Sequence, residues 1–194
     1  MIARIAARLR SEAGYSLMEL LISMGILAAV MTSLSVLLVS ATNSELDMNQ
    51  RFQAQTQARL GLDRLRREVH CAVSVSPASA AGATVAAGVP AAWARLTIPA
   101  TCPTSGGLTS ITWCSVANGA NRWDLWRYAG ATCSGTGRKY ADHLTLQTIF
   151  SYTAQSANKL ATLNVRLPVN VKPAETSLLY TLDDDIVLRN STRT

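Results

Sequence analysis

An uninterrupted apolar run near the N-terminus constrains this chain more than any other feature. From Tyr15 to Ser44 the only charged residue is Glu19, and no charge occurs between Leu20 and Ser44. A helix of about 20 predominantly apolar residues is long enough to cross the hydrocarbon core of a bilayer. The run therefore predicts a membrane-spanning helix and argues against a wholly cytosolic protein.

The charge distribution predicts the orientation of this span. The chain has 194 residues and a net charge of +6, and three arginines precede the apolar run, namely Arg4, Arg8 and Arg10. Basic residues before a span favour a cytoplasmic N-terminus, with the following chain outside the cytoplasm. No later segment concentrates positive charge strongly enough to make nucleic acid the leading partner.

Three interpretations compete for the first 44 residues: a secretory signal peptide, a plain membrane anchor and a prepilin leader with its helix. Val39-Ser40-Ala41 looks like a signal-peptide cleavage site, but the apolar region of a signal peptide is about 7 to 15 residues and this run is longer. Glu19 helps to distinguish a plain membrane anchor from a prepilin helix. A carboxylate inside a span costs a few kcal/mol and needs a partner, unless it lies at the interface and snorkels into water.

The residues around Glu19 resemble a motif of a known protein family. The segment from Gly14 to Leu21, GYSLMELL, resembles the prepilin peptidase motif of the type IV filament superfamily. In that motif a glycine precedes the cleaved bond, an aromatic residue, usually Phe, follows it, and a glutamate is fifth in the mature chain. Gly14, Tyr15 and Glu19 match these positions, with Tyr15 in place of the usual Phe.

This resemblance implies a processing and assembly mechanism. A prepilin peptidase would cleave between Gly14 and Tyr15 on the cytoplasmic side and N-methylate Tyr15. In a filament, Glu19 would pair with the new amino terminus of a neighbouring subunit, which would offset the desolvation of both charges. The resemblance also implies that the first half of a long helix spans the membrane and the second half packs on an outer domain.

The helical pattern continues to about Cys71. Ala58, Leu62, Leu65 and Val69 are spaced by 4, 3 and 4 residues, which places them on one apolar face. On the solvent side we expect i,i+4 ion pairs: Arg59 with Asp63, Asp63 with Arg67, and Arg64 with Glu68. A helix from Tyr15 to Cys71 would be roughly 85 Å long at about 1.5 Å per residue.

The remaining chain is predicted to form a β-rich domain. Residues 77–92 are rich in Ala, Gly and Ser and indicate a loop, and Asn118-Gly119 is a hairpin turn signal. The expected strands are 94–99, 109–116, 121–128, 143–152, 159–168, 177–182 and 186–189. The predicted fold is α+β, a long N-terminal helix packed on an antiparallel sheet. Its parts are a leader (1–14), a membrane or filament-core helix (15–44), an amphipathic continuation (45–73) and the outer domain (74–194).

The four cysteines, Cys71, Cys102, Cys114 and Cys133, all follow the span. An even number of cysteines outside the cytoplasm favours two disulfides, and the close Cys-x-x-Cys spacing of a zinc site is absent. Four cysteines allow three pairings. From the predicted hairpin we favour Cys102 with Cys133, which leaves Cys71 at the helix end to pair with Cys114.

No catalytic constellation is visible, so we expect no enzyme activity and no cofactor. His70 and His143 are the only histidines, and no Gly-x-Ser-x-Gly or phosphate-binding glycine loop occurs. Asp183-Asp184-Asp185 offers carboxylates of the kind that bind calcium. Because their spacing fits no calcium loop, we interpret them as a turn between two strands and expect no metal.

One segment interleaves basic and aromatic residues as a single-stranded DNA surface does. It runs from Arg122 to Tyr128, and Arg138, Lys139 and Tyr140 extend the pattern. Strand alternation gives the same pattern without DNA, with Trp123, Leu125 and Arg127 on one face and the intervening residues on the other. We favour the strand interpretation.

The sequence therefore resembles a minor pilin or pseudopilin of a type IV pilus, type II secretion or competence filament. Detailed resemblance covers about residues 8–71, and 125–127 and 186–190 faintly resemble J-type minor pseudopilins. The partners implied are prepilin peptidase, other pilin subunits and the cytoplasmic membrane. Two alternatives remain open: a membrane-anchored adhesin or sensor, and a DNA-binding minor pilin of a DNA-uptake system.

Overall fold

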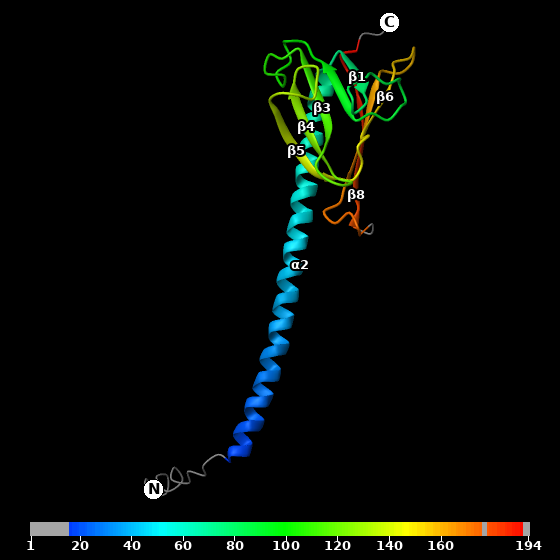
Figure 1. Ribbon diagram of the computed structural model, residues 1–194. Coiled ribbons are helices and arrows are strands. Elements are labelled where there is room, and N and C mark those ends of the chain that lie inside the picture. The colour runs from blue at the N-terminus through cyan, green and yellow to red at the C-terminus, as the bar shows by residue number, and fades with distance from the viewer. Residues whose placement is uncertain (1–15, 176–177, 192–194) are drawn as a thin grey trace. The chain divides into compact units, whose positions relative to one another are not determined.

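The computed structural model describes residues 16–175 and 178–191. The chain forms two compact units, one that ends at Met48 and one that begins at Asn49. A single helix, α2 (Leu17–Cys71), provides most of the first unit and the start of the second (Figure 1). The predicted long helix is thereby confirmed from Leu17 onward, whereas its expected first residue, Tyr15, lies outside the described part of the chain.

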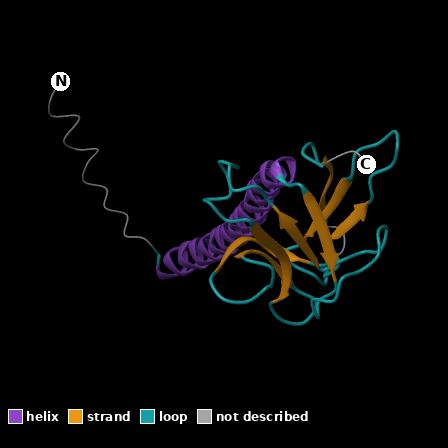
Figure 2. Cartoon of the chain, turned by 90° about the horizontal axis from the view of Figure 1, so that it is seen from above, coloured by secondary structure: helices purple, strands orange, loops and turns teal. Residues whose placement is uncertain are grey.

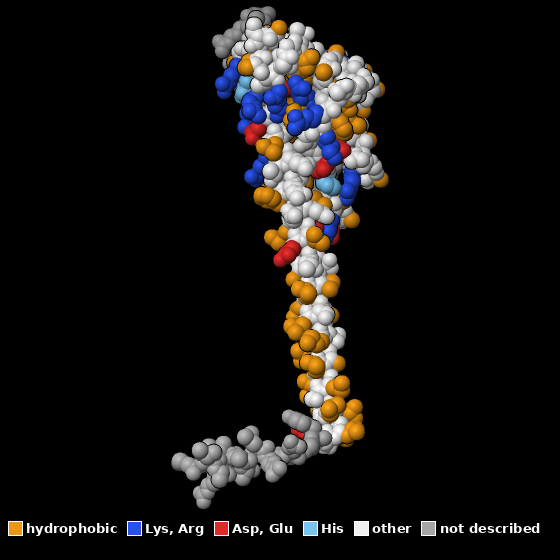
Figure 3. Space-filling model, turned by 90° about the vertical axis from the view of Figure 1, so that its left-hand side faces the viewer, with side chains coloured by type: hydrophobic (Ala, Val, Ile, Leu, Met, Phe, Trp, Pro, Cys, Tyr) orange, Lys and Arg blue, Asp and Glu red, His pale blue; other side chains and the backbone are white. Residues whose placement is uncertain are grey.

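The first half of α2 exposes its apolar side chains. Large hydrophobic residues from Leu17 to Val39 are about half to three-quarters exposed, and hydrophobic side chains line this stretch in the face drawn in Figure 3. The hydroxyls of Ser23, Thr32 and Ser33 donate hydrogen bonds to backbone carbonyls within the helix. Because these polar groups have partners inside the helix, the segment is suited to an apolar surrounding such as a bilayer.

In the second unit, an antiparallel sheet follows the helix (Figures 1 and 2). Within the described residues its strand order is β1-β2-β3-β4-β5-β7-β6, with β8 paired to β7 on its other side. The join between β5 and β7 is a single residue pair, Leu144 with Val169. The strands are β1 (Ser74–Ala78), β2 (Trp93–Thr97), β3 (Ser110–Ala117), β4 (Trp123–Ala129), β5 (Gly137–Leu144), β6 (Phe150–Thr153), β7 (Thr162–Val169) and β8 (Tyr180–Val187).

The core of this unit lies between the second half of α2 and the sheet. The predicted apolar face of the helix is confirmed, because Ala58, Leu62, Leu65 and Val69 are all buried in one cluster with sheet residues. Full burial of a leucine contributes about 1.5–3 kcal/mol to folding. Gly61 allows a close approach, since a Cβ at this position would lie 3.3 Å from the Cβ of Tyr140 in β5.

Several strand predictions are confirmed and others are wrong. The hairpin with a turn at Asn118-Gly119 is confirmed by the antiparallel pairing of β3 with β4. The start of the predicted 77–92 loop instead belongs to β1, which pairs with β2 along its whole length. The predicted 143–152 strand is two strands, because β5 ends at Leu144 and β6 begins at Phe150. His143, one residue before this break, has a φ of 58° in the left-handed region.

The aspartate run was also placed wrongly. Asp183-Asp184-Asp185 does not form a turn between two strands but lies inside β8, where it pairs with Asn164, Val165 and Arg166 of β7. The strand tolerates three successive carboxylates because each has a protein partner: Arg166 for Asp183, Arg66 for Asp184 and Asn164 for Asp185.

Candidate functional site

The residues predicted to direct processing lie at the start of the helix. Gly14 and Tyr15 fall outside the described residues. Glu19 is in the first turn of α2, and its backbone N–H donates to the carbonyl of Ser16 at 2.9 Å. A carboxylate in the first turn interacts favourably with the positive end of the helix dipole. Its side chain is exposed and has no hydrogen-bond or ionic partner among the described residues, so it is accessible to a partner from outside the chain.

A second group of charged residues lies where α2 meets the sheet, centred on Glu68. This carboxylate is fully buried, and three side chains donate to it: Arg64 at 3.0 Å, Arg127 at 2.8 Å and the indole nitrogen of Trp113 at 2.8 Å. A buried carboxylate is tolerated when such donors replace its lost hydration. The sequence prediction placed Glu68 on the solvent side, which is wrong because β3 and β4 extend over the helix beyond its apolar stripe.

The three donors come from distant parts of the chain. Arg64 is one helical turn before Glu68, whereas Trp113 is in β3 and Arg127 in β4. Arg64 also donates to the backbone carbonyl of Thr104, in the loop that follows β2. The predicted Arg64–Glu68 pair is thus confirmed, and it belongs to a network that joins helix, sheet and loop. No local pattern in the helix indicated the other two donors.

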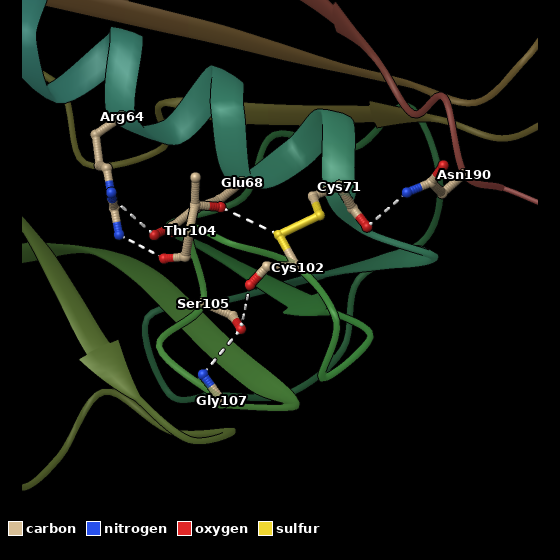
Figure 4. The surroundings of a disulfide bond; sticks show 8 residues. All are labelled: Arg64, Glu68, Cys71, Cys102, Thr104, Ser105, Gly107 and Asn190. Carbon is tan, nitrogen blue, oxygen red and sulfur yellow. Dashed lines mark hydrogen bonds and ion pairs between the residues drawn. A yellow bond between two sulfur atoms is a disulfide. The ribbon is translucent and has the colours of Figure 1, made fainter.

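A disulfide binds the loop after β2 to the last residue of α2 (Figure 4). The disulfides are Cys71 with Cys102 and Cys114 with Cys133. All four cysteines are paired, as expected, but the pairing that we favoured, Cys71 with Cys114 and Cys102 with Cys133, is wrong.

The correct pairing follows from strands that the sequence did not reveal. The N–H of Val73 donates to the carbonyl of Thr97 at 2.8 Å, which brings the end of β2 to the end of α2 and places Cys102 beside Cys71. At the other disulfide, the hydroxyl of Thr112 donates to the carbonyl of Gly130. This contact holds the β4–β5 loop against β3, so that Cys133 reaches Cys114.

On the side of α2 that faces β8, the basic side chains have matching acceptors. Arg66 forms ion pairs with Asp63 at 3.1 Å and with Asp184 at 2.9 Å. Arg59 donates to the Tyr180 hydroxyl at 2.8 Å. The expected Arg59–Asp63 pair is therefore replaced, and Arg67 bonds the backbone carbonyl of Asp63 rather than its carboxylate.

The aspartates of β8 do not converge on one point. Alternate residues of a strand face opposite sides of the sheet, so Asp184 faces the helix while its two neighbours face away. Within residues 16–175 and 178–191, no group of three or more His, Cys, Asp or Glu side chains lies close enough to hold a metal ion. The absence of a bound metal in the native protein stays a prediction.

The basic and aromatic residues of β4 separate onto two faces, which confirms the predicted alternation along a strand, while the absence of DNA binding stays a prediction. Leu125 is buried in the core and Arg127 reaches Glu68 on the helix. Trp126 and Tyr128 are on the opposite face, where their rings stack with centroids 6.0 Å apart. Arg122 donates to the carbonyl of Val171 at 2.8 Å. The arginines and the stacked aromatic rings therefore do not form one interleaved surface.

Comparison with known proteins identifies the N-terminal segment. Residues 9–35 match the family model of the prokaryotic N-terminal methylation motif. The match includes Gly14, Tyr15 and Glu19, and it supports a type IV pilin-like protein that is processed by prepilin peptidase and assembles with other pilin subunits. By length and composition α2 can cross a membrane, so motif and helix together suggest a membrane-anchored protein. The chain matches no curated protein and no solved structure.

Proposed function

We propose that this protein is a minor pilin or pseudopilin, a non-catalytic structural subunit of a type IV filament. The observation that carries the proposal is the methylation motif at residues 9–35, which runs directly into a helix with exposed apolar side chains and an accessible Glu19. Such a helix needs an apolar environment before and after assembly, which a bilayer and a filament core both provide. The β-rich domain of about 120 residues favours a minor subunit over a major one.

In this proposal the motif residues act in sequence. Prepilin peptidase removes residues 1–14, and the new amino group of Tyr15 is methylated and remains cationic. When the subunit moves from the bilayer into the filament, the Glu19 carboxylate pairs with the Tyr15 amine of a neighbouring subunit. Because both charges would otherwise be desolvated without a partner, the pair sets the axial register of the subunits.

The junction in the second unit gives this helix a defined attachment to its outer domain. The Cys71–Cys102 disulfide binds the last residue of α2 to the loop after β2, and the Glu68 network binds the preceding turn to β3 and β4. On the other side, the Asn190 side chain donates to the carbonyl of Cys71 at 3.0 Å. In a filament subunit this attachment would fix how the outer domain is presented.

The test of the proposed function is incorporation of a Glu19→Ala variant. The full-length chain would be expressed with its own assembly machinery, and its amount in membranes and in sheared filaments would be measured by immunoblotting. We expect Glu19→Ala to insert into the membrane normally. Its amount in filaments should fall on the order of tenfold relative to wild type, because the variant lacks one partner of a desolvated charge pair. Ser23→Ala, in the next turn, is the matched control. Equal incorporation of Glu19→Ala and wild type would refute the assignment.

A further inference from the structure

Arginines accumulate without matching carboxylates on the side of α2 that faces β4 and β5. Arg64 and Arg127 donate their Nε atoms to the same oxygen of Glu68, Oε1, at 3.0 and 2.8 Å. Arg138 of β5 lies directly opposite Arg127 in the β4–β5 register. We call Arg64, Arg127 and Arg138 the arginine cluster. Of the three guanidinium groups in this cluster, those of Arg64 and Arg127 share the Glu68 carboxylate, and Arg138 does not contact it.

The position of Arg138 is supported by a chain of ring contacts. Its guanidinium carbon is 5.3 Å from the centre of the Tyr140 ring, and that ring is 4.9 Å from the ring of Trp113. Trp113 in turn donates to the second oxygen of Glu68. The side chain of Arg138 is exposed and has no carboxylate partner among the described residues. Like charges directly opposite each other on neighbouring strands are destabilising, so this arrangement costs free energy in the isolated subunit.

The arginines on the β8 side of the helix have other acceptors, namely the Tyr180 hydroxyl for Arg59 and the backbone carbonyl of Asp63 for Arg67. On the side facing β8, Arg66 has two carboxylates within 3.1 Å, from Asp63 and Asp184. In the arginine cluster both oxygens of Glu68 are already occupied by its three donors. The side chains of Arg64 and Arg127 are 29% and 15% exposed, so water screens them only in part. Beyond its Nε bond to Glu68, Arg127 has no further hydrogen bond within the described residues.

The surroundings of the cluster indicate the class of its partner. Leu60, one helical turn before Arg64, is 61% exposed and lies on the same side of the helix. The stacked rings of Trp126 and Tyr128 face the other side of β4, so this aromatic pair does not lie beside the arginine cluster. Figure 3, which looks onto the side where β5 lies in Figure 1, shows Lys and Arg side chains gathered on this face. A basic cluster next to an exposed leucine fits a protein surface that presents a carboxylate beside an apolar group.

We propose that the arginine cluster docks an acidic side chain of a neighbouring filament subunit. This inference rests on the proposed function, since it takes its partner from the assembly. A carboxylate would accept charge-assisted hydrogen bonds from Arg138 and Arg127, the geometry for which guanidinium groups are suited. It would also relieve the repulsion between these two arginines. The contact therefore forms in the filament, and the isolated subunit retains an unmatched positive charge.

Carbodiimide cross-linking of an Arg138→Lys variant tests the contact directly, because the reagent joins an amine only to a carboxylate that it touches. Isolated filaments would be treated, digested and analysed by mass spectrometry. We expect a cross-link from position 138 to an Asp or Glu of another filament subunit. Arg138→Gln is the matched control, in which position 138 carries no amine. Lys139, on the other face of β5, should react equally in both variants. A cross-link from position 138 only to Glu68 of the same chain, or none, would overturn the proposal.

Incorporation of an Arg138→Glu variant provides the second test. We expect its amount in filaments to fall by at least about tenfold, because a glutamate at position 138 would repel the carboxylate that the cluster docks. Lys159→Glu, which reverses the charge of an exposed lysine between β6 and β7, should incorporate normally. If wild type enters filaments and Arg138→Glu enters equally, the docking site is wrong while the proposed function stands. If wild type never enters filaments, the proposed function fails. Salt-dependent binding of a single-stranded DNA oligonucleotide that Arg138→Glu alone abolishes would instead assign the cluster to nucleic acid.

Discussion

Replacing Glu68 by glutamine measures how strongly the charged network holds α2 to the sheet. The amide is nearly the same size as the carboxylate, so packing is preserved while the negative charge between Arg64 and Arg127 is lost. The amide oxygen can still accept, but the NH2 group cannot, so at least one of the three present donors loses its acceptor. Removing one partner from a buried ion pair costs about 3–5 kcal/mol.

The expected loss of unfolding free energy is somewhat smaller than this range, because Arg64 and Arg127 are not fully buried. Their exposed fractions of 29% and 15% allow partial hydration of the freed guanidinium groups. We therefore expect Glu68→Gln to lower the free energy of unfolding of the second unit by about 2–4 kcal/mol. The measurement is urea denaturation of the full chain in detergent micelles, followed by tryptophan fluorescence.

Asp63→Asn is the matched control for this prediction. It removes a carboxylate from the same helix, but the Asp63–Arg66 pair is 57% and 42% exposed and Arg66 keeps Asp184. Exposed pairs contribute about 0–1 kcal/mol, so the control should unfold nearly as wild type does. A Glu68→Gln protein within about 1 kcal/mol of the control would refute the view that this network is a main attachment of the helix.

Three further substitutions test other parts of the fold by the same denaturation assay. Leu65→Ala removes a fully buried side chain from the helix face and should cost about 2–5 kcal/mol; a loss below 1 kcal/mol would contradict its place in the core. Cys102→Ser removes a disulfide between residues 31 positions apart and should lower the free energy of unfolding by about 2–4 kcal/mol. When both proteins are first reduced, the variant and wild type should be equally stable. Gly137→Ala should destabilise by about 1–3 kcal/mol because its Cβ would clash with the ring of Tyr128; a stability equal to wild type would show that the ring moves freely.

The features that sequence could predict are those with a local signal. The charge-free run and the spacing of Ala58, Leu62, Leu65 and Val69 predicted the helix and its buried face correctly, because helical periodicity depends only on near neighbours. Asn118-Gly119 predicted the β3–β4 hairpin for the same reason. The α+β class followed from these two patterns.

The features that sequence could not predict depend on distant partners. Glu68 looked like half of a solvent-side i,i+4 pair, but its burial is set by Trp113 and Arg127, which are 45 and 59 residues away. The aspartate run resembled a turn because three like charges are unfavourable in a strand. Their partners Arg66, Asn164 and Arg166 come from α2 and β7, and no local rule identifies them.

The disulfide pairing that we favoured was wrong because it too depends on residues that are distant in the sequence. Our pairing was inferred from the hairpin alone, and the alanine-rich stretch after the helix was taken to begin a loop. Once β1 pairs with β2, the end of β2 lies at the end of the helix, and Cys102 is brought to Cys71. A strand that contains Pro77 and several small residues carries too weak a signal to reveal this.

The mature N-terminus tests the central claim most directly. The full-length chain would be expressed with its own prepilin peptidase, purified from membranes and analysed by intact-mass and N-terminal peptide mass spectrometry. The filament-subunit proposal predicts a chain that begins at Tyr15 with an N-methylated amine. A Gly14→Ala variant serves as the control and should be processed less completely. A chain that still begins at the leader, or one that is cut after Ala41 as a signal peptide would be, would contradict the assignment.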